Sequence, residues 1–144
     1  MIRPATHNDA TEIARLATEL GYPTAAAVMA DRLAALLDDP RHHVAVAAGP
    51  GGRLLGWAHV EHRQSLEGGQ RAELMGLIVD STARQRGLGR GLVETIQAWV
   101  TARGLKALTV RSNAARIESH PFYAALGFEH EKTQHVYVKR SSHS

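Results

Sequence analysis

A run of apolar residues that leads into a glycine-bearing turn and then into a helical pattern constrains this chain more than any other feature. Residues 73–79 have the apolar character of a buried strand, and a helical pattern follows the turn. Three glycines and three arginines lie at this junction: Gly87, Gly89, Gly91, Arg84, Arg86 and Arg90. The free N–H groups and the dipole at a helix start attract phosphate oxygens, and glycine lets them approach closely. The junction therefore predicts an anion-binding turn.

The spacing of the glycines excludes two common phosphate-binding motifs. The dinucleotide motif Gly-x-Gly-x-x-Gly, counted from Gly87, needs a glycine where the chain has Leu92. The P-loop needs a lysine directly after its last glycine, and Arg90 and Leu92 follow the glycines here. The pattern that fits is Gln/Arg-x-x-Gly-x-Gly/Ala, which the chain spells as Arg84-Gln85-Arg86-Gly87-Leu88-Gly89.

This pattern resembles the pyrophosphate-binding signature of the GNAT superfamily of N-acetyltransferases. A second cluster is similar to the same family in order and spacing. It consists of a strand that ends in an asparagine, Leu108-Thr-Val-Arg-Ser-Asn113, and of the segment Pro121-Phe-Tyr-Ala-Ala-Leu-Gly-Phe128. The resemblance covers residues 72–138, and the N-terminal half of the chain agrees with the family in the order of its elements.

The resemblance implies a mixed α/β fold within a single domain of residues 1–144, a usual domain size. About four helices are expected to flank a central, mostly antiparallel sheet of about six or seven strands. Periodicity predicts helices at about 9–20, 24–38 and 88–104, with a short one opened by Pro121. The expected strands are 2–6, 43–48, 54–61, 71–79, 106–112, 128–132 and 135–139, with a polar loop at 63–70.

An interior glycine in the strand at 71–79 predicts an irregularity. Gly76 favours a bulge that splays this strand from the one at 106–112, since glycine otherwise weakens a strand. The alternative is that Gly76 lets a neighbour pack closely. In the family this strand pairs with the pantetheine arm of the cofactor, which maps onto the backbone of Leu77, Ile78 and Val79.

The resemblance implies that acetyl-CoA is the donor and that an amine attacks it directly, without a covalent acyl-enzyme. The chain has no cysteine, which agrees with this. The CoA diphosphate is expected at the backbone amides of Gln85 through Arg90, with Arg84 at the start of the motif. Asn113 is expected at the cofactor arm. The alternatives are a plain helix start with arginines in solvent, and a turn cap for Asn113.

An alkylammonium acceptor, with a pKa of about 10, must lose a proton before it attacks. Residues Ala72 to Gly89 align without gaps to the histone acetyltransferase branch of the family, whose general-base glutamate falls at Glu73. The alternative is a solvated glutamate near a strand end, and His59 and Glu61 are reserve bases that act through water. Tyr123 matches the family tyrosine that protonates the departing thiolate, and its alternative is core packing beside Phe122 and Phe128.

Composition limits the other classes of function. A formal net charge of +3 without a basic block argues against a nucleic-acid partner, although the sequence pI is about 9.7. The histidine spacing shows no metal motif, so no metal is expected. No secretory or membrane-spanning segment is recognised, and a cytoplasmic protein is expected.

The acceptor is expected to be an amine of a small molecule or peptide. In the family its site lies between the first helix pair and the loop before the glutamate strand, where Tyr22 and Glu67 are candidates to meet a cationic amine. The resemblance also implies a homodimer. The alternative function is a catalytically silent acyl-CoA-binding or regulatory module.

Overall fold

The computed structural model describes residues 1–84, 86–111 and 119–141. The chain divides into two compact units, Met1–Arg111 and Ser112–Ser144. The single domain expected for the whole chain stays a prediction. The anion-binding turn and the sheet both belong to the first unit.

The first unit is built on a five-stranded sheet in the order β1-β2-β3-β4-β5. The strands are β1 (Ile2–Pro4), β2 (His42–Ala48), β3 (Leu54–Ser65), β4 (Gly69–Val79) and β5 (Leu108–Val110). Neighbouring strands are antiparallel except β4 and β5, which are parallel. The predicted mixed α/β class and mostly antiparallel sheet are therefore confirmed.

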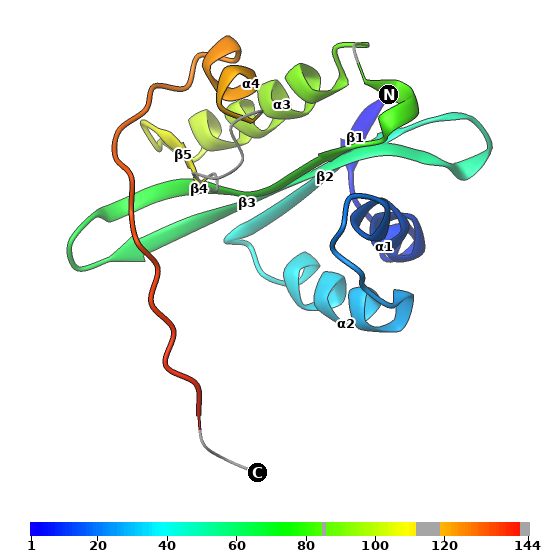
Figure 1. The fold of residues 1–144 in the computed structure, drawn as a ribbon, viewed down its shortest axis with the longest axis horizontal. Helices are drawn as coiled ribbons and strands as arrows, with labels where there is room; N and C mark the ends of the chain where they lie inside the picture. The colour runs from blue at the N-terminus through cyan, green and yellow to red at the C-terminus, as the bar shows by residue number, and fades with distance from the viewer. Residues whose placement is uncertain (85, 112–118, 142–144) are drawn as a thin grey trace. The chain divides into compact units, whose positions relative to one another are not determined.

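Three longer helices cover the two faces of this sheet. They are α1 (Ala10–Glu19), α2 (Ala26–Leu37) and α3 (Leu88–Ala102), with α1 and α2 on one face and α3 on the other (Figure 1). On α1, Ile13, Leu16 and Ala17 recur at helical spacing and are buried in one core with Leu33 of α2. On α3 the buried residues are Leu92, Val93, Ile96 and Val100. The helical pattern therefore placed α3 correctly after the glycine turn.

The loop expected at 63–70 is mostly strand, which is a correction to the sequence interpretation. β3 and β4 remain paired as far as Ser65 and Gly69. The side chains of residues 64–70 are exposed, so apolar alternation does not mark this part of the hairpin. Backbone pairing, with side-chain contacts such as the one between His62 and Gln70, extends the ladder beyond the core.

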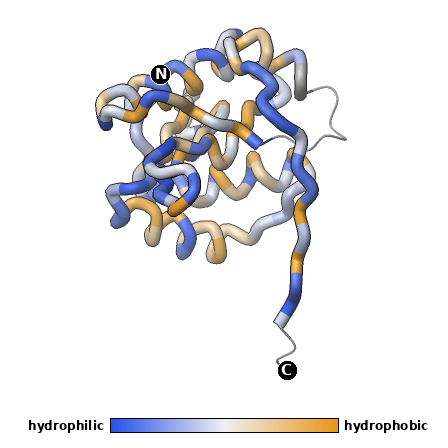
Figure 2. Tube along the Cα trace, turned by 90° about the vertical axis from the view of Figure 1, so that its left-hand side faces the viewer, coloured by the Kyte–Doolittle hydropathy of each residue, from blue (hydrophilic) through white to orange (hydrophobic). Residues whose placement is uncertain are grey.

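The second unit contains α4 (Ser119–Ala125), the short helix expected near Pro121, and an extended tail. The described residues form no strand at 128–132 or 135–139, so the sheet has five strands instead of six or seven. Figure 2 shows a short hydrophobic stretch in the tail, where Val136 is 85% exposed and Tyr137 is 89% exposed. Strand-like composition is insufficient here because a strand also needs a neighbouring edge to pair with.

Candidate active site

The glycine turn has the geometry of an anion-binding helix start. Gly87 caps α3 with φ at 74°, a left-handed conformation that favours glycine. The N–H group of Gly91, in the first turn of the helix, donates to the carbonyl oxygen of Gly87 at 3.0 Å. The N–H groups before it belong to the outward-pointing end of the helix. Arg84, Arg86 and Arg90 are exposed around this end, whereas Gln85 lies outside the described residues.

Gly91 has a packing role, and the phosphate-facing role expected from the sequence stays a prediction. A Cβ atom on Gly91 would lie 2.9 Å from Cδ1 of Ile2 in β1. The missing side chain therefore brings α3 close to the edge strand. The backbone N–H groups expected to bind the anion are then those of Gly87 through Arg90.

A buried aspartate, which sequence reasoning missed, holds the start of the turn. Asp80 follows β4 directly, and its carboxylate accepts hydrogen bonds from the backbone N–H (2.9 Å) and hydroxyl (2.8 Å) of Thr82. It also pairs with Arg53 at 2.9 Å and with Arg15 of α1 at 3.3 Å. These contacts, led by the Thr82 N–H, lower the pKa of Asp80 to about 2 against the opposing effect of burial. The Asp-Ser-Thr order at 80–82 was the available signal, because it is typical of a capped turn.

Replacing Asp80 with asparagine should lower the free energy of unfolding by about 2 kcal/mol at pH 7. Because the folded pKa is below the unfolded value, this stability is present above about pH 4 and is lost as pH falls toward 2. Urea unfolding at several pH values measures it, and the gap between wild type and Asp80→Asn should close in acid. Asp31→Asn, on the exposed side of α2, is the control. An equal gap at pH 7 and pH 2.5 would refute the assignment.

β4 carries a bulge beside Gly76, as the sequence predicted, and the splay from the strand at 106–112 stays a prediction. The parallel pairing ends at Leu74 opposite Val110, and no described residue of β5 pairs with Met75–Val79. Against β3, Leu74 pairs with Val60 and Gly76 with His59, so Met75 is the extra residue. The β4 segment with Leu77, Ile78 and Val79 therefore lies beyond the β5 pairing, where the resemblance places pantetheine.

The close-packing alternative for Gly76 also holds. A Cβ atom on Gly76 would lie 2.8 Å from Cζ3 of Trp57, so a larger residue would displace the indole. Gly76 therefore serves the bulge and the packing of Trp57 together. Both interpretations of this glycine were correct.

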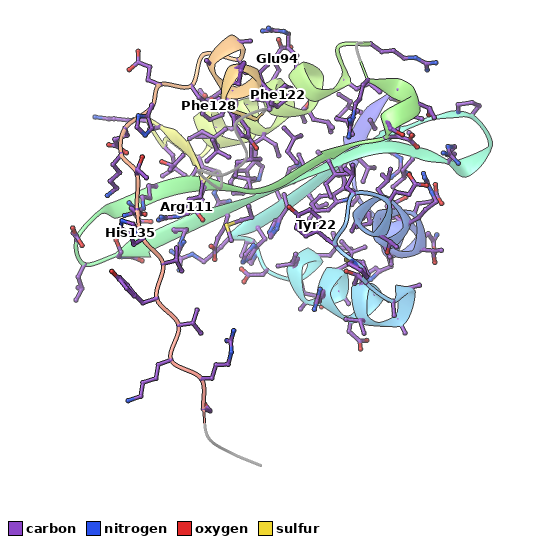
Figure 3. The ribbon with its side chains drawn as sticks, in the orientation of Figure 1. Tyr22, Glu94, Arg111, Phe122, Phe128 and His135 are labelled. Carbon is purple, nitrogen blue, oxygen red and sulfur yellow. The ribbon has the colours of Figure 1, made fainter. Side chains whose placement is uncertain are left out.

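Glu73 lies at the last part of β4 that still pairs with β5. It is buried, with 5% of its surface exposed, instead of solvated as in the alternative interpretation. Its Oε1 atom accepts a 2.9 Å bond from Nε of Arg111, and Nη1 of Arg63 lies 3.3 Å from both oxygens. Arg111, labelled in Figure 3, and Arg63 were missed by sequence reasoning. They lie 38 and 10 residues from Glu73 along the chain, so only the folded sheet joins them.

The two reserve bases lie on the same face of the sheet as Glu73. Glu61 pairs directly with Glu73 across β3 and β4 and also lies 3.4 Å from Nε2 of His42. His59 shares a 2.8 Å contact between its Nε2 atom and Nδ1 of His42. Burial, with a smaller effect of His42, lowers the pKa of His59 to about 4, which makes it a weak base near neutral pH.

Tyr123 belongs to the second unit. Its ring packs edge-on against Phe122 and Phe128, with centroids 5.4 and 5.8 Å away. These contacts agree with the core-packing alternative and leave the catalytic role of Tyr123 a prediction. Asn113, expected at the cofactor arm, lies outside the described residues.

The two residues proposed to meet a cationic amine do not come together. Tyr22 lies on the connection between α1 and α2, and Figure 3 shows it apart from Arg111 along the sheet. Glu67 is exposed at the tip of the β3–β4 hairpin, which Figure 1 shows at the far end of the sheet from α1. They cannot share one acceptor amine in this arrangement.

In the described part of the chain, no group of three or more histidine or acidic side chains is placed to hold a metal ion. Within those same ranges, no helix has both the length and the apolar character needed to cross a membrane.

Comparison with known proteins identifies the family. Residues 8–128 match the model of the acetyltransferase (GNAT) family, and the chain belongs to this family. It is 30% identical over 142 residues to the aminoglycoside N(6')-acetyltransferase type 1 of Stenotrophomonas maltophilia, covering 96% of this chain and 91% of that relative.

Two solved structures share the fold at lower identity. The apo aminoglycoside 6'-N-acetyltransferase AAC(6')-IG of Acinetobacter haemolyticus aligns with a TM-score of 0.85, 16% identity and 99% of both chains. AAC(6')-Iy in complex with the bisubstrate analogue CoA-S-monomethyl-acetylneamine aligns with a TM-score of 0.86, 22% identity and 98% of both chains.

The protein is therefore an acetyl-CoA-dependent N-acetyltransferase that transfers the acetyl group to an amine. The comparisons support this enzyme over the silent acyl-CoA-binding module.

Proposed function

We propose that the buried carboxylate of Glu73 receives the proton of the acceptor amine, directly or through one water molecule. The observation that carries this proposal is its place in the sheet. Glu73 is one of the three β4 residues that pair with described residues of β5, directly before the bulge at Met75. A base at this point lies next to the strand segment that the proposal assigns to pantetheine.

The Oε2 atom of Glu73 is the oxygen best suited to this task. Oε2 lies 3.3 Å from Nη1 of Arg63, whereas Oε1 also accepts the shorter bond from Nε of Arg111. Arg111 thus fixes the carboxylate in place through Oε1. Arg63 and Arg111 act as positioning residues in this proposal.

Backbone N–H groups and arginine side chains bind the acetyl donor in this proposal. The diphosphate of acetyl-CoA is assigned to the N–H groups of Gly87 through Arg90, with Arg84, Arg86 and Gln85 beside them. The pantetheine arm runs along Leu77, Ile78 and Val79, and Asn113 contacts it. This assignment rests on the left-handed cap at Gly87 and on the place of Leu77, Ile78 and Val79 beyond the described β5 pairing.

The acetyl group passes directly from the thioester to the amine in a single step. The neutral amine nitrogen attacks the thioester carbonyl, the C–S bond breaks, and the products are the N-acetyl amine and CoA. The amine proton goes to Glu73, and the departing thiolate takes a proton from the hydroxyl of Tyr123. No acyl-enzyme forms, and solvent restores both side chains.

Replacing Tyr123 with phenylalanine should lower kcat by about 10²-fold, because a positioned acid contributes at least that much. The KM for acetyl-CoA should stay within about twofold, since binding uses other groups. Steady-state release of CoA thiol measures both, and the cysteine-free chain gives the thiol-reactive dye no background. Tyr137→Phe, at an exposed tyrosine, is the matched control. Full activity of Tyr123→Phe would leave this residue a packing partner of Phe122 and Phe128.

The proposal also covers the acceptor amine, the cellular location and the oligomeric state of the protein. The relatives are named for aminoglycosides, so aminoglycosides are the first acceptors to assay, followed by other small amines and basic peptides. A cytoplasmic protein is proposed because acetyl-CoA is made and used there. A homodimer is proposed from the family resemblance, and sedimentation measures it.

A further inference from the structure

A cavity of about 500 Å³ lies between the α1–α2 pair and the sheet. This volume is typical of small-molecule sites. Its walls are mainly apolar, with Ile13 from α1, Leu33 from α2 and Val44 from β2. Three lining residues carry polar groups: Arg32 of α2, and Trp57 and His59 of β3.

The cavity borders the proposed reaction centre. Trp57 covers Gly76, where an added Cβ atom would lie 2.8 Å from the indole. His59 pairs with Gly76, and the neighbouring pair on the same face is Glu61 with Glu73. A ligand in the cavity therefore lies beside the bulge, with the β4 edge on one side and Glu73 in the adjacent pair.

Two of the three polar lining residues carry no charge near neutral pH. The indole of Trp57 is uncharged, and its Nε1–H is closed off from solvent. His59 is neutral near pH 7, since burial lowers its pKa to about 4.

The charges around the cavity disfavour a polycation. Among the described residues that line the cavity, Arg32 is the charged one and none carries a carboxylate. The nearby carboxylates are compensated, Glu73 by Arg63 and Arg111, and Glu61 by Arg63 and His42. A molecule with several ammonium groups would meet few free partners here.

We propose that this cavity binds the body of the acceptor amine, which is an aromatic or branched aliphatic primary monoamine. The inference rests on the proposed function, since it assigns the substrate class of the same site. It separates this chain from the class for which its relatives are named.

Binding is tested without catalysis. The chain has two tryptophans, so Trp99→Phe leaves Trp57 as the single indole fluorophore. Titration with 4-methoxyphenethylamine should change its emission in a saturable way, and neamine should not.

Turnover is tested with a matched pair of variants on α2. Ala35→Phe adds a ring to the cavity lining, whereas Ala30→Phe adds the same ring at an exposed position outside it. For 4-methoxyphenethylamine, Ala35→Phe should raise KM at least 10-fold with the Kd for acetyl-CoA unchanged. Ala30→Phe should match the wild type. Wild-type kcat/KM should favour this amine over neamine at least 10-fold.

Two results would overturn the inference and remain distinguishable. Acetylation of neamine with neither binding nor acetylation of 4-methoxyphenethylamine overturns the substrate class and leaves the proposed function standing. Saturable binding of 4-methoxyphenethylamine without acetyl transfer to any amine in the panel overturns both, because the cavity then serves a ligand other than the acceptor.

Discussion

Replacing Gly89 with valine should weaken acetyl-CoA binding at least 100-fold. Gly89 lies in the first turn of α3, directly after the cap at Gly87. A branched side chain there fills the approach to the N–H groups and displaces the diphosphate. Two charge-assisted hydrogen bonds of about 1.5–3 kcal/mol each account for this loss.

Calorimetric titration with acetyl-CoA measures the effect. The fold should survive, because valine is at least as compatible with a helix as glycine. Ala98→Val adds the same two methyl groups at an exposed position on α3 and should bind normally. If Gly89→Val kept wild-type affinity, the diphosphate would lie elsewhere and the cofactor assignment would fail.

Replacing Glu73 with glutamine should lower kcat/KM for the amine by about 10²–10³-fold at pH 7, while the Kd for acetyl-CoA stays within about twofold. Glutamine keeps the shape and an oxygen for Arg63 and Arg111 but is a very poor proton acceptor. The two arginine side chains are 42% and 49% exposed, so solvent can stabilise their charges in the variant.

The pH profile separates a base from a structural glutamate. If Glu73 is the base, the deficit should shrink as pH rises toward the amine pKa of about 10, where the acceptor loses its proton unaided. A structural role would give a deficit independent of pH. Glu61→Gln, at the directly opposite glutamate, is the control. A larger loss in Glu61→Gln than in Glu73→Gln would transfer the role to Glu61.

Local chemistry explains what the sequence could predict. The spacing of Gly87 and Gly89 defines a turn before a helix, and the cap at Gly87 has the conformation that this requires. Helical periodicity likewise placed α1, α2 and α3. Gly76 predicted the bulge because few other roles suit a glycine inside a strand.

Non-local pairing explains what the sequence could not predict. The tail around Val136 has strand composition, yet the described residues give it no neighbouring strand. The hairpin beyond Glu61 is held by backbone bonds that leave no apolar pattern. The arginine partners of Glu73 and Asp80 come from distant parts of the chain, so neither charge cluster is visible in a linear motif.

The bulge at Met75 shifts the alternation of side chains between the two faces of β4 by one residue. Before it, the residue on the α1–α2 face is odd-numbered Glu73; after it, the even-numbered Gly76 and Ile78 pair with His59 and Trp57 on that face. Deleting Met75 would give β4 one regular alternation of side chains, which would place Glu73 and the segment proposed to bind the cofactor in a single continuous strand. The single extra residue separates the part of β4 that carries Glu73 from the part that is proposed to bind the cofactor. A substitution in one part therefore need not change the orientation of the side chains in the other.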